Sequence, residues 1–519
     1  MKAKKWYLSV IFFGLFLVSI PLAQAKTILF VPADDRPVSL EYIADTGKAA
    51  QLTILVPPAE LLASRGLSGE SDELWGWVMD NCRQADAMVI AADSVIYGGL
   101  VDSRTHHFEP SVINERLNRF RQLKKANPNA GVYVFSTIMR TPKASAGDVE
   151  PPYYEKYGRN IFQLTALKDK ADMTGLTNAE EKLVKLETAI IPPEYLADWM
   201  QRREKNFKIN SELIEMTKAG LFNYLILGRD DTSPYSQSHH EGRALSLLAA
   251  KLPASKFQTF PGADQLGMVL LAKAYNDLTM QLPIVKVEYA LGTGASTIPS
   301  YEDQAVGKTI IDHIQAAGGI VLPNPKKPDL IIAVNTPVDG VTEEADSLSN
   351  IAASTNATAQ FVDRIQSELA AGSKVAIADI AFGNGSDNSL MKELSERHLL
   401  DKLSAYSGWN TASNTIGYAI SQGMMAASMG EPDRKQLLAV RYLDDWAYQA
   451  NIRKQLREEI IYPRNGSLQY LDELRPLLTS EAAKRERLFA QKNLWLSPET
   501  VNVSFPWNRM FEIRIAIEP

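Results

Sequence analysis

The sequence predicts an α/β protein with two successive doubly wound parallel-sheet domains, a helical insertion and a mainly helical C-terminal region. Three observations support this fold class. Short runs rich in β-branched residues alternate with segments of helical periodicity, which is typical of βαβ units. Most of these runs are continuously apolar, as expected for parallel strands buried on both faces. A break near residue 280, in YNDLTMQLPIV, divides the predicted strands into six and four.

The first 25 residues carry the pattern of a cleavable signal peptide. Lys2, Lys4 and Lys5 precede an apolar stretch of about 15 residues, and the cleavage signal Ala23-Gln24-Ala25 follows it. This stretch is shorter than the roughly 20 apolar residues that a membrane span needs. We therefore expect an extracytoplasmic protein, periplasmic or secreted, with no stable membrane insertion after cleavage.

The first α/β domain is predicted over residues 26–282. The gap between its fourth and fifth strands has helical periodicity, so we expect a helical insertion at about 143–220. The candidate strands are 27–32, 52–57, 87–93, 131–137, 222–228 and 256–261.

The second α/β domain is predicted over residues 283–430. A C-terminal, mainly helical extension follows over 431–519 and ends in an alternating run typical of an edge strand. A single (β/α)8-type barrel is the alternative, because the strands of the whole chain could close on one another. The insertion and the break near 280 favour two domains. The candidate strands of the second domain are 284–291, 319–322, 329–335 and 374–380.

Charge and cysteine content exclude several kinds of partner and of stabilisation. Removing residues 1–25 deletes three lysines and no acid, which changes the formal net charge from −6 to −9. Nucleic acid and anionic lipid both attract basic surfaces, so we expect neither as a partner. Cys82 is the only cysteine, so no intramolecular disulfide can form and stability must come from core burial.

Carboxylates follow five of the predicted strands at the points where the strands end. Ligands of open parallel sheets bind outside these ends, so the acids predict a polar cleft. The competing explanation is that each acid caps the following helix. The two Asp-Asp pairs, each beside Arg36 or Arg229, are harder to explain in this way, because one cap needs one side chain. The acids are Asp34, Asp35, Asp93, Asp230, Asp231, Asp264, Asp379 and Asp387.

A second polar cluster lies in AYSGWNTASNTIGYAIS, residues 405–421. Asn410 and Asn414 are four residues apart, so on a helix their amides share one face. With the indole of Trp409, they would offer hydrogen bonds and an apolar wall to a polyhydroxylated ligand. The alternative is a helix N-cap at Asn410 or Thr411 beside a core tryptophan. Asn384 supplies a further amide just beyond the strand at 374–380.

Known cofactor motifs are absent or incomplete in the sequence. GTGAST at 292–297 lacks the third glycine and the immediate helix of the dinucleotide fingerprint. The sequence has no Walker loop, no G-x-S-x-G and no H-E-x-x-H. His239 and His240 follow Asp231 closely and leave an Asp/His metal site as an alternative, although histidines that open a helix are more often surface residues. We therefore expect no cofactor and no bound metal.

Eight short motifs, spread over nearly the whole chain, are together similar to those of one known family. They are PADDRPVS, GRDDTSP, FPGADQ, SYED, ADIAFGNGSD, GWNTASNTIG, RYLDDWAYQ and FPWNRMFE. In combination they resemble one bacterial family, the domain of unknown function family 4127. The resemblance implies no particular reaction, so the expected chemistry rests on the residues themselves.

The residues predict an exported hydrolase with glycoside-hydrolase-like chemistry, acting on a carbohydrate or cell-wall-type glycan. Such enzymes use one protonated and one ionised carboxyl group, and adjacent acids can split their pKa values in this way. The alternatives are an extracytoplasmic binding protein for a small polar ligand and a metal-dependent hydrolase. We assign catalysis to Asp34, Asp35, Asp230 and Asp231. We assign substrate binding to Arg36, Asp93, Arg229, Asp264, Asp379, Asn384, Asp387, Trp409, Asn410 and Asn414.

Overall fold

The computed structural model describes residues 25–143 and 149–518. The predicted signal peptide, apart from Ala25, lies outside the described residues. Over the described ranges, no helix combines the length and the apolar character that crossing a membrane requires.

A six-stranded parallel sheet occupies the first half of the chain, in the order β2-β1-β3-β4-β5-β6. All six strands coincide with apolar runs in the sequence, and β3 and β5 are buried along their whole length. The strand order reverses between β1 and β3, because β2 lies on one side of β1 and every later strand lies on the other. The strands are β1 (Thr27–Val31), β2 (Thr53–Leu55), β3 (Ala87–Ala91), β4 (Gly131–Ile138), β5 (Tyr224–Arg229) and β6 (Phe257–Pro261).

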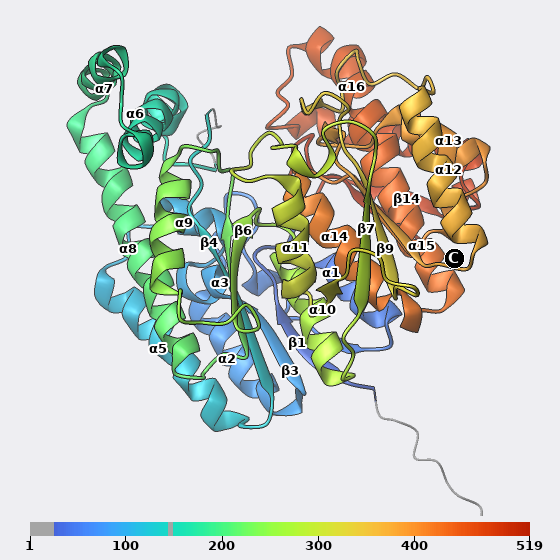
Figure 1. The fold of residues 1–519 in the computed structure, drawn as a ribbon. Coiled ribbons are helices and arrows are strands. Elements are labelled where there is room, and N and C mark those ends of the chain that lie inside the picture. Colours follow the sequence, from blue (N-terminus) through green and yellow to red (C-terminus); the bar gives the residue numbers. More distant parts are fainter. Residues whose placement is uncertain (1–24, 144–148, 519) are drawn as a thin grey trace, which may run out of the picture.

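Helices cover both faces of this sheet, and the insertion between β4 and β5 is helical as predicted (Figure 1). Its helices α6 and α7 project away from the sheet, while the long α8 returns along β4 and β5. Thr177 and Glu180 form a capping box that begins α7. The helices are α1 (Glu41–Ala49), α2 (Ser71–Asn81), α3 (Ala92–Tyr97), α4 (Leu100–Thr105), α5 (Pro110–Ala126), α6 (Tyr154–Thr174), α7 (Asn178–Ile190), α8 (Pro193–Lys218), α9 (Gln237–Leu248) and α10 (Leu266–Leu278).

The second sheet has five parallel strands in the order β13-β11-β9-β7-β8. Numbered from its own first strand, this sheet has the order 2-1-3-4-5, which matches the order of the first five strands in the first sheet. The order reverses between β7 and β9. The sequence predicts four of these strands and misses β13, which contains no β-branched residue. The strands are β7 (Ile284–Tyr289), β8 (Ile320–Val321), β9 (Leu330–Asn335), β11 (Val375–Asp379) and β13 (Ala405–Ser407). The helices are α11 (Val306–Ala316), α12 (Asn356–Ala370), α13 (Asn388–Glu396) and α14 (Ala412–Met425).

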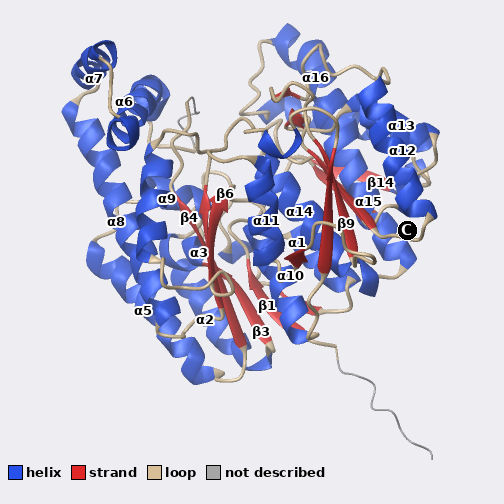
Figure 2. Ribbon diagram, viewed as in Figure 1, coloured by secondary structure: helices blue, strands red, loops and turns tan. Residues whose placement is uncertain are grey.

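Helices α10, α11 and α14 lie between the two sheets (Figures 1 and 2). One core of buried side chains runs from Phe30 in β1 through Leu270 and Ile416 in the helices to Ile332 in β9. No closed barrel forms within the described residues, so the (β/α)8 alternative is wrong. The domain boundaries at 282 and 430 stay predictions, because the shared core joins the two sheets.

The C-terminal region is mainly helical, as predicted, and ends in a small strand pair. The last alternating run does not join a sheet edge: β14 and β15 pair with each other in antiparallel fashion. The segment between them, residues 505–513, folds back toward the first sheet. The elements are α15 (Glu431–Arg441), a π-helical segment (Tyr442–Ile452), α16 (Arg453–Leu456), α17 (Arg475–Asn493), β14 (Val501–Ser504) and β15 (Arg514–Ile517).

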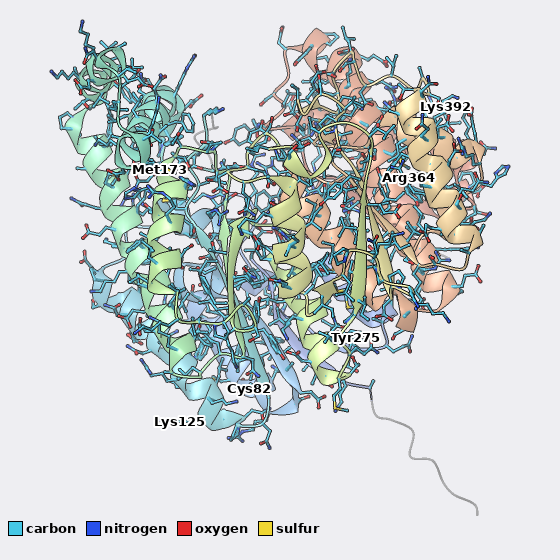
Figure 3. All side chains as sticks on the ribbon, in the orientation of Figure 1. Cys82, Lys125, Met173, Tyr275, Arg364 and Lys392 are labelled. Atoms are coloured by element: carbon cyan, nitrogen blue, oxygen red, sulfur yellow. The ribbon has the colours of Figure 1, made fainter. Side chains whose placement is uncertain are left out.

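The single cysteine, Cys82, is buried at the end of α2 (Figure 3). Burial raises the pKa of its thiol, which disfavours the reactive thiolate. The side chain packs with Trp75, Val78 and Leu123 in the core on one face of the first sheet. Cys82 is therefore a packed core residue.

Candidate active site

A polar pocket of about 290 Å³ lies outside the carboxyl ends of the strands of the first sheet. Its walls come from the segments after β1, β3, β4, β5 and β6, from loops of the second sheet and from residues 505–513. This position includes the point where the strand order reverses, the usual ligand position in doubly wound sheets. Among the described residues, its charged lining consists of Asp34, Asp230, Asp231, Asp264, Arg36, Arg104, Arg140 and Arg509.

Arg36 joins the ends of β1 and β6. Its Nε donates to both oxygens of Asp34 at 3.0 Å, and its Nη2 donates to Oδ1 of Asp264 at 2.7 Å. All three side chains are buried. The neighbouring Glu512 lies 3.9 Å from Nη1 of the same arginine. The buried guanidinium therefore holds two pocket carboxylates at fixed positions.

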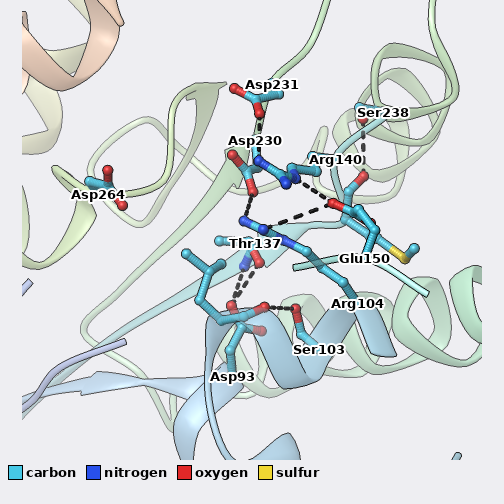
Figure 4. Close-up of polar contacts among 12 residues, drawn as sticks. Asp93, Ser103, Arg104, Thr137, Arg140, Glu150, Asp230, Asp231, Ser238 and Asp264 are labelled. Carbon is cyan, nitrogen blue, oxygen red and sulfur yellow. Dashed lines mark hydrogen bonds and ion pairs between the residues drawn. The ribbon is translucent and has the colours of Figure 1, made fainter. Parts of the chain in front are cut away.

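A second charged group lies after β4 and β5, in the part of the pocket that Figure 4 shows. Arg104 in α4 donates to Oδ2 of Asp230 at 2.5 Å, and Arg140 donates to Oδ2 of Asp231 at 2.9 Å. Both arginines also contact the buried Glu150, at 3.9 Å from Arg104 and 2.5 Å from Arg140. Adjacent aspartates therefore have separate arginine partners, and one glutamate lies behind both arginines.

The pocket carboxyl groups differ in their preference for a proton. Burial of Asp231 and repulsion from Asp230 raise the pKa of Asp231, although Arg140 and Arg104 oppose the rise. Burial acts in the same direction on Asp264, but Arg36 and Asn410 outweigh it and hold the pKa of Asp264 below its ordinary value. Asp231 is also the more accessible, with 23% of its side chain exposed against 6% for Asp264. One pocket thus holds a carboxyl group biased toward protonation and one biased toward ionisation.

Asp35, adjacent to Asp34, points elsewhere. Its Oδ1 accepts a 2.6 Å hydrogen bond from Nε1 of Trp507, and its backbone N–H binds the carbonyl of Ala63. Burial raises the pKa of Asp35, with the hydrogen bond from Trp507 opposing it. Trp507 lines the pocket, and its ring lies 5.3 Å from the guanidinium carbon of Arg36. Asp35 therefore orients a wall of the pocket from behind.

Three asparagines bring the second half of the chain to the same pocket. The amide of Asn410 donates to Oδ2 of Asp264 at 3.3 Å, and Oδ1 of Asn414 accepts from the backbone N–H of Asp264 at 3.1 Å. Asn384 donates its backbone N–H to the carbonyl of Asn410 at 2.8 Å. Two asparagines of the 405–421 cluster therefore bind Asp264, a strand-end acid of the first sheet.

Four lining residues other than glycine have left-handed backbone conformations. The φ angles are 33° at Asp231, 68° at Tyr301, 58° at Asn384 and 59° at Asn410. Asparagine and aspartate adopt this region with little strain, whereas a tyrosine does so at a cost. Such residues concentrate at binding and catalytic sites, where the surrounding structure holds them in place.

The capping explanation fails for most of the strand-end acids. Helices α1 and α9 begin after Leu40 and Ser236, well past the two Asp-Asp pairs. Helix α10 begins after Gln265, which directly follows Asp264. Only Ser236 among these three caps its helix with a side chain. Asp387, in contrast, caps α13 by accepting from the N–H of Ser389.

Several predicted site residues lie outside the pocket lining. Asp93 is buried beneath it and accepts from Ser136 and Thr137; burial raises its pKa to about 6. Arg229 turns away and forms a bidentate pair with Asp303 at 2.6 and 2.7 Å. Trp409 is buried behind Phe511, with 5.3 Å between ring centroids. Asp379 and Asp387 lie at the end of the second sheet, where both bind Asn335.

The lining residues missing from the sequence-based assignment include Arg104, Arg140, Tyr301, Trp507 and Arg509. Arg104 belongs to a short helix, and Arg140 and Tyr301 belong to loops without a strand-end acid beside them. The local sequences of Arg104 and Arg140 carry no signal of a site, whereas Tyr301 lies in SYED, one of the motifs quoted above. Trp507 and Arg509 lie in FPWNRMFE, one of the motifs quoted above, which is the signal that could have identified them.

The histidines do not assemble a metal site within the described ranges, where no group of three or more His, Cys, Asp or Glu is placed to hold a metal ion. His239 instead pairs with Asp169 at 2.6 Å, and Arg243 binds the other oxygen of that carboxylate. Both partners join the insertion helix α6 to α9. The pair of His239 with Asp169 therefore links the helical insertion to α9, which packs against β4 and β5 of the first sheet.

Fold and pocket define a two-sheet α/β protein with a charged pocket outside the strand ends. A sequence-family model described as "Protein of unknown function (DUF4127)" matches residues 28–516, so the chain belongs to that family, as the resemblance implied. A search of curated proteins found no match. One solved structure with a distant match is a complex between a UDP-glucosyltransferase from Polygonum tinctorium capable of glucosylating indoxyl and 3,4-dichloroaniline. It has 10% identity, covers 86% of this chain and 100% of that chain, and its TM-score of 0.17 supports no conclusion about fold or function.

Proposed function

We propose that the protein is an exported hydrolase of glycosidic bonds in a carbohydrate or cell-wall-type glycan, and that the charged pocket is its active site. One observation carries this proposal: Asp231 and Asp264 line the same pocket, and the pKa is raised at the first and lowered at the second. Glycosidic cleavage needs one protonated and one ionised carboxyl group on either side of the scissile bond.

The roles follow from these protonation preferences. Asp231 donates its proton to the glycosidic oxygen as the sugar departs. Asp264 either attacks the anomeric carbon, forming a glycosyl ester that water hydrolyses with Asp231 then acting as base, or takes a proton from the water that attacks this carbon; these are the two routes that glycosidases use. Arg36 fixes the carboxylate of Asp264, and Arg140 fixes that of Asp231. Such fixed geometry lowers the cost of orienting the reacting groups.

The remaining lining suits a polyhydroxylated ligand. Asn384, Asn410 and Asn414 supply amides, and the exposed Tyr301 supplies a hydroxyl. The aromatic wall of Trp507 and Phe511 offers an apolar surface of the kind on which a sugar ring can lie. A mixture of directional polar groups and an apolar wall is common in small-molecule sites.

The charge content of the pocket favours turnover over binding alone. Each carboxylate that enters a ligand-filled pocket loses water, at a cost that its partners must offset. A pure binding protein gains little from four aspartates in one pocket, whereas an acid and a base of a hydrolase both need to be carboxyl groups. The binding protein for a small polar ligand remains the rival outcome of the following experiment.

The experiment is a screen of the mature protein, residues 26–519, against cell-wall glycans and aryl glycosides. Released sugar is measured by mass spectrometry, and binding is measured in parallel by calorimetry. Hydrolysis of at least one glycan, unchanged by EDTA, is the expected result. Binding without product after long incubation would replace the hydrolase with the binding protein, and loss of turnover in EDTA would assign the chemistry to a metal.

A further inference from the structure

We propose a second ligand site at the end of the second sheet, which takes a small polyhydroxylated molecule without negative charge, such as a neutral or amino sugar. A cavity of about 400 Å³ lies there. It is distinct from the pocket of the proposed hydrolase, and the inference does not depend on that activity.

The position of this cavity matches that of the first pocket. Both sheets have the same strand order, which reverses between β1 and β3 in the first and between β7 and β9 in the second. Ala290 and Leu291 line the cavity directly after β7, and Asn335 and Thr336 line it at the end of β9. The cavity thus occupies the crevice where ligands bind in sheets of this type.

The lining defines the kind of ligand. Asp339, Glu343 and Asp387 supply acceptors, and no lysine, arginine or histidine lines the cavity among the described residues. Hydroxyl groups of Ser349, Thr355 and others add partners that both donate and accept. An anion would meet three carboxylates and no cationic side chain, whereas hydroxyl or ammonium groups would find acceptors. Leu291 and Phe382 supply apolar surface for a ring.

Thr336 provides the second, independent observation. Thr336 lines the cavity, and the residue is only 2% exposed. Its Oγ1 makes no hydrogen bond to any residue that the structure describes. A buried hydroxyl without a partner costs stability, so its presence in a cavity wall indicates a partner that comes from outside the chain.

A short ribbon separates the two sites. Strands β10 (Glu343–Glu344) and β12 (Phe382–Gly383) pair in parallel fashion, and Asn384 follows directly. Glu343 and Phe382 line the second cavity, while Glu344 binds Tyr301 and Asn384, which line the first pocket. Successive residues of a strand point to opposite faces, so the ribbon forms a wall shared by the two sites.

Replacement of Thr336 by valine separates a ligand role from a structural role. Thr336→Val keeps the shape and removes a hydroxyl that has no described partner, so the Tm of the unliganded protein should stay equal or rise. The matched control is Thr342→Val. The Oγ1 of Thr342 is also buried and has no partner among the described residues, but Thr342 lines neither pocket.

Binding of D-glucose, D-glucosamine and inorganic phosphate to the mature chain is measured by ligand-observed NMR and calorimetry. We expect a sugar to bind the wild type and Thr342→Val equally, and to bind Thr336→Val about 3- to 10-fold more weakly, the effect of one lost hydrogen bond. Ala357→Trp, which fills the cavity, should abolish this binding with the fold intact by circular dichroism. Equal sugar affinity in Thr336→Val and wild type, absence of sugar binding, or binding of phosphate alone would overturn the proposal.

Discussion

Nη2 of Arg36 donates a 2.7 Å hydrogen bond to Oδ1 of Asp264, which lies 228 residues further along the chain. The same nitrogen lies 2.8 Å from Oδ2 of Asp34. One buried guanidinium group therefore closes the pocket between the ends of β1 and β6. It also gives the carboxylate of Asp264 its preference for the ionised form.

Arg36→Gln should destabilise the protein strongly. The change leaves Asp34 and Asp264 buried without their cation, and removal of one partner from a buried ionic group costs about 3–5 kcal/mol. The free energy of unfolding is measured by denaturant titration. Arg514→Gln is the matched control, because Arg514 pairs with Glu41 at 2.8 Å with half of its side chain exposed. It should cost less than about 1 kcal/mol. Equal effects of the two changes would refute the bridging role.

Asp35→Asn should keep turnover, although the sequence assigns Asp35 to catalysis. An asparagine oxygen can still accept from Nε1 of Trp507, so the wall of the pocket keeps its orientation. Asp35→Ala leaves the indole N–H unpaired and should cost about 1–3 kcal/mol. It should raise KM more than it lowers kcat, because Trp507 lines the pocket in which the substrate is proposed to bind. Loss of turnover in Asp35→Asn with an unchanged Tm would return Asp35 to a catalytic role.

Glu302 should make the protein less stable as the pH rises from about 4.5 to about 7. Burial raises the pKa of Glu302 to about 7 from an ordinary 4.5, against hydrogen bonds from Ser413. Its carboxyl group holds its proton in the folded state and loses it on unfolding within this range, so stability is full below 4.5 and reduced above 7.

Glu302→Gln should remove this pH dependence. The amide can still accept from the N–H of Ser413, while its charge no longer changes. Relative to wild type, the free energy of unfolding of the variant should rise by up to about 3 kcal/mol between pH 5 and pH 8. Denaturant titrations at both pH values measure this difference. A constant difference between variant and wild type across this range would contradict the assignment.

Arg140→Gln should move the alkaline limb of the pH–activity profile to higher pH. Arg140 lowers the pKa of Asp231, so its removal raises that pKa further. A general acid works only while protonated, and activity therefore persists to higher pH in the variant. The profile of kcat/KM from pH 4 to pH 9 records the shift. A shift to lower pH would exclude Asp231 as the acid.

Local sequence patterns predict most of the strands and helices, but fewer of the residues that line the pocket. Continuous apolar runs mark the long strands, because those strands are buried on both faces. Strand β13 (Ala405–Ser407) contains no β-branched residue and so carries no strand signal. Pairing of β14 with β15 depends on a turn at 505–513 that alternation alone does not reveal.

The sequence predicts pocket residues that directly follow a strand. It misses residues that reach the pocket from segments distant in the sequence. Asp34 and Asp264 reach the pocket from strand ends as the sequence indicates. The neighbours Asp34 and Asp35 have different partners: Asp34 binds Arg36, whereas Asp35 binds Trp507 from the far end of the chain. Arg104 and Arg140 meet at Glu150 only because β3 and β4 are adjacent in the sheet.

The proposed acid role of Asp231 is tested by comparing two substrates that share a sugar from the screen above and differ in leaving group. An alcohol must be protonated as it leaves, whereas dinitrophenolate leaves without help. Asp231→Asn should lower kcat/KM at least about 100-fold on the natural glycan and less than about 10-fold on the dinitrophenyl glycoside. Asp264→Asn should lose activity on both.

The control is Asp80→Asn, an exposed position in α2, which should behave as wild type on both substrates. The Tm of every variant is measured, and rates are compared only between variants whose Tm equals that of the wild type. Loss of folding is thereby separated from loss of chemistry. The predicted result is a selective loss in Asp231→Asn that follows the leaving group. Wild-type rates in Asp231→Asn on the natural glycan would contradict the assignment of this pocket as a glycosidase site.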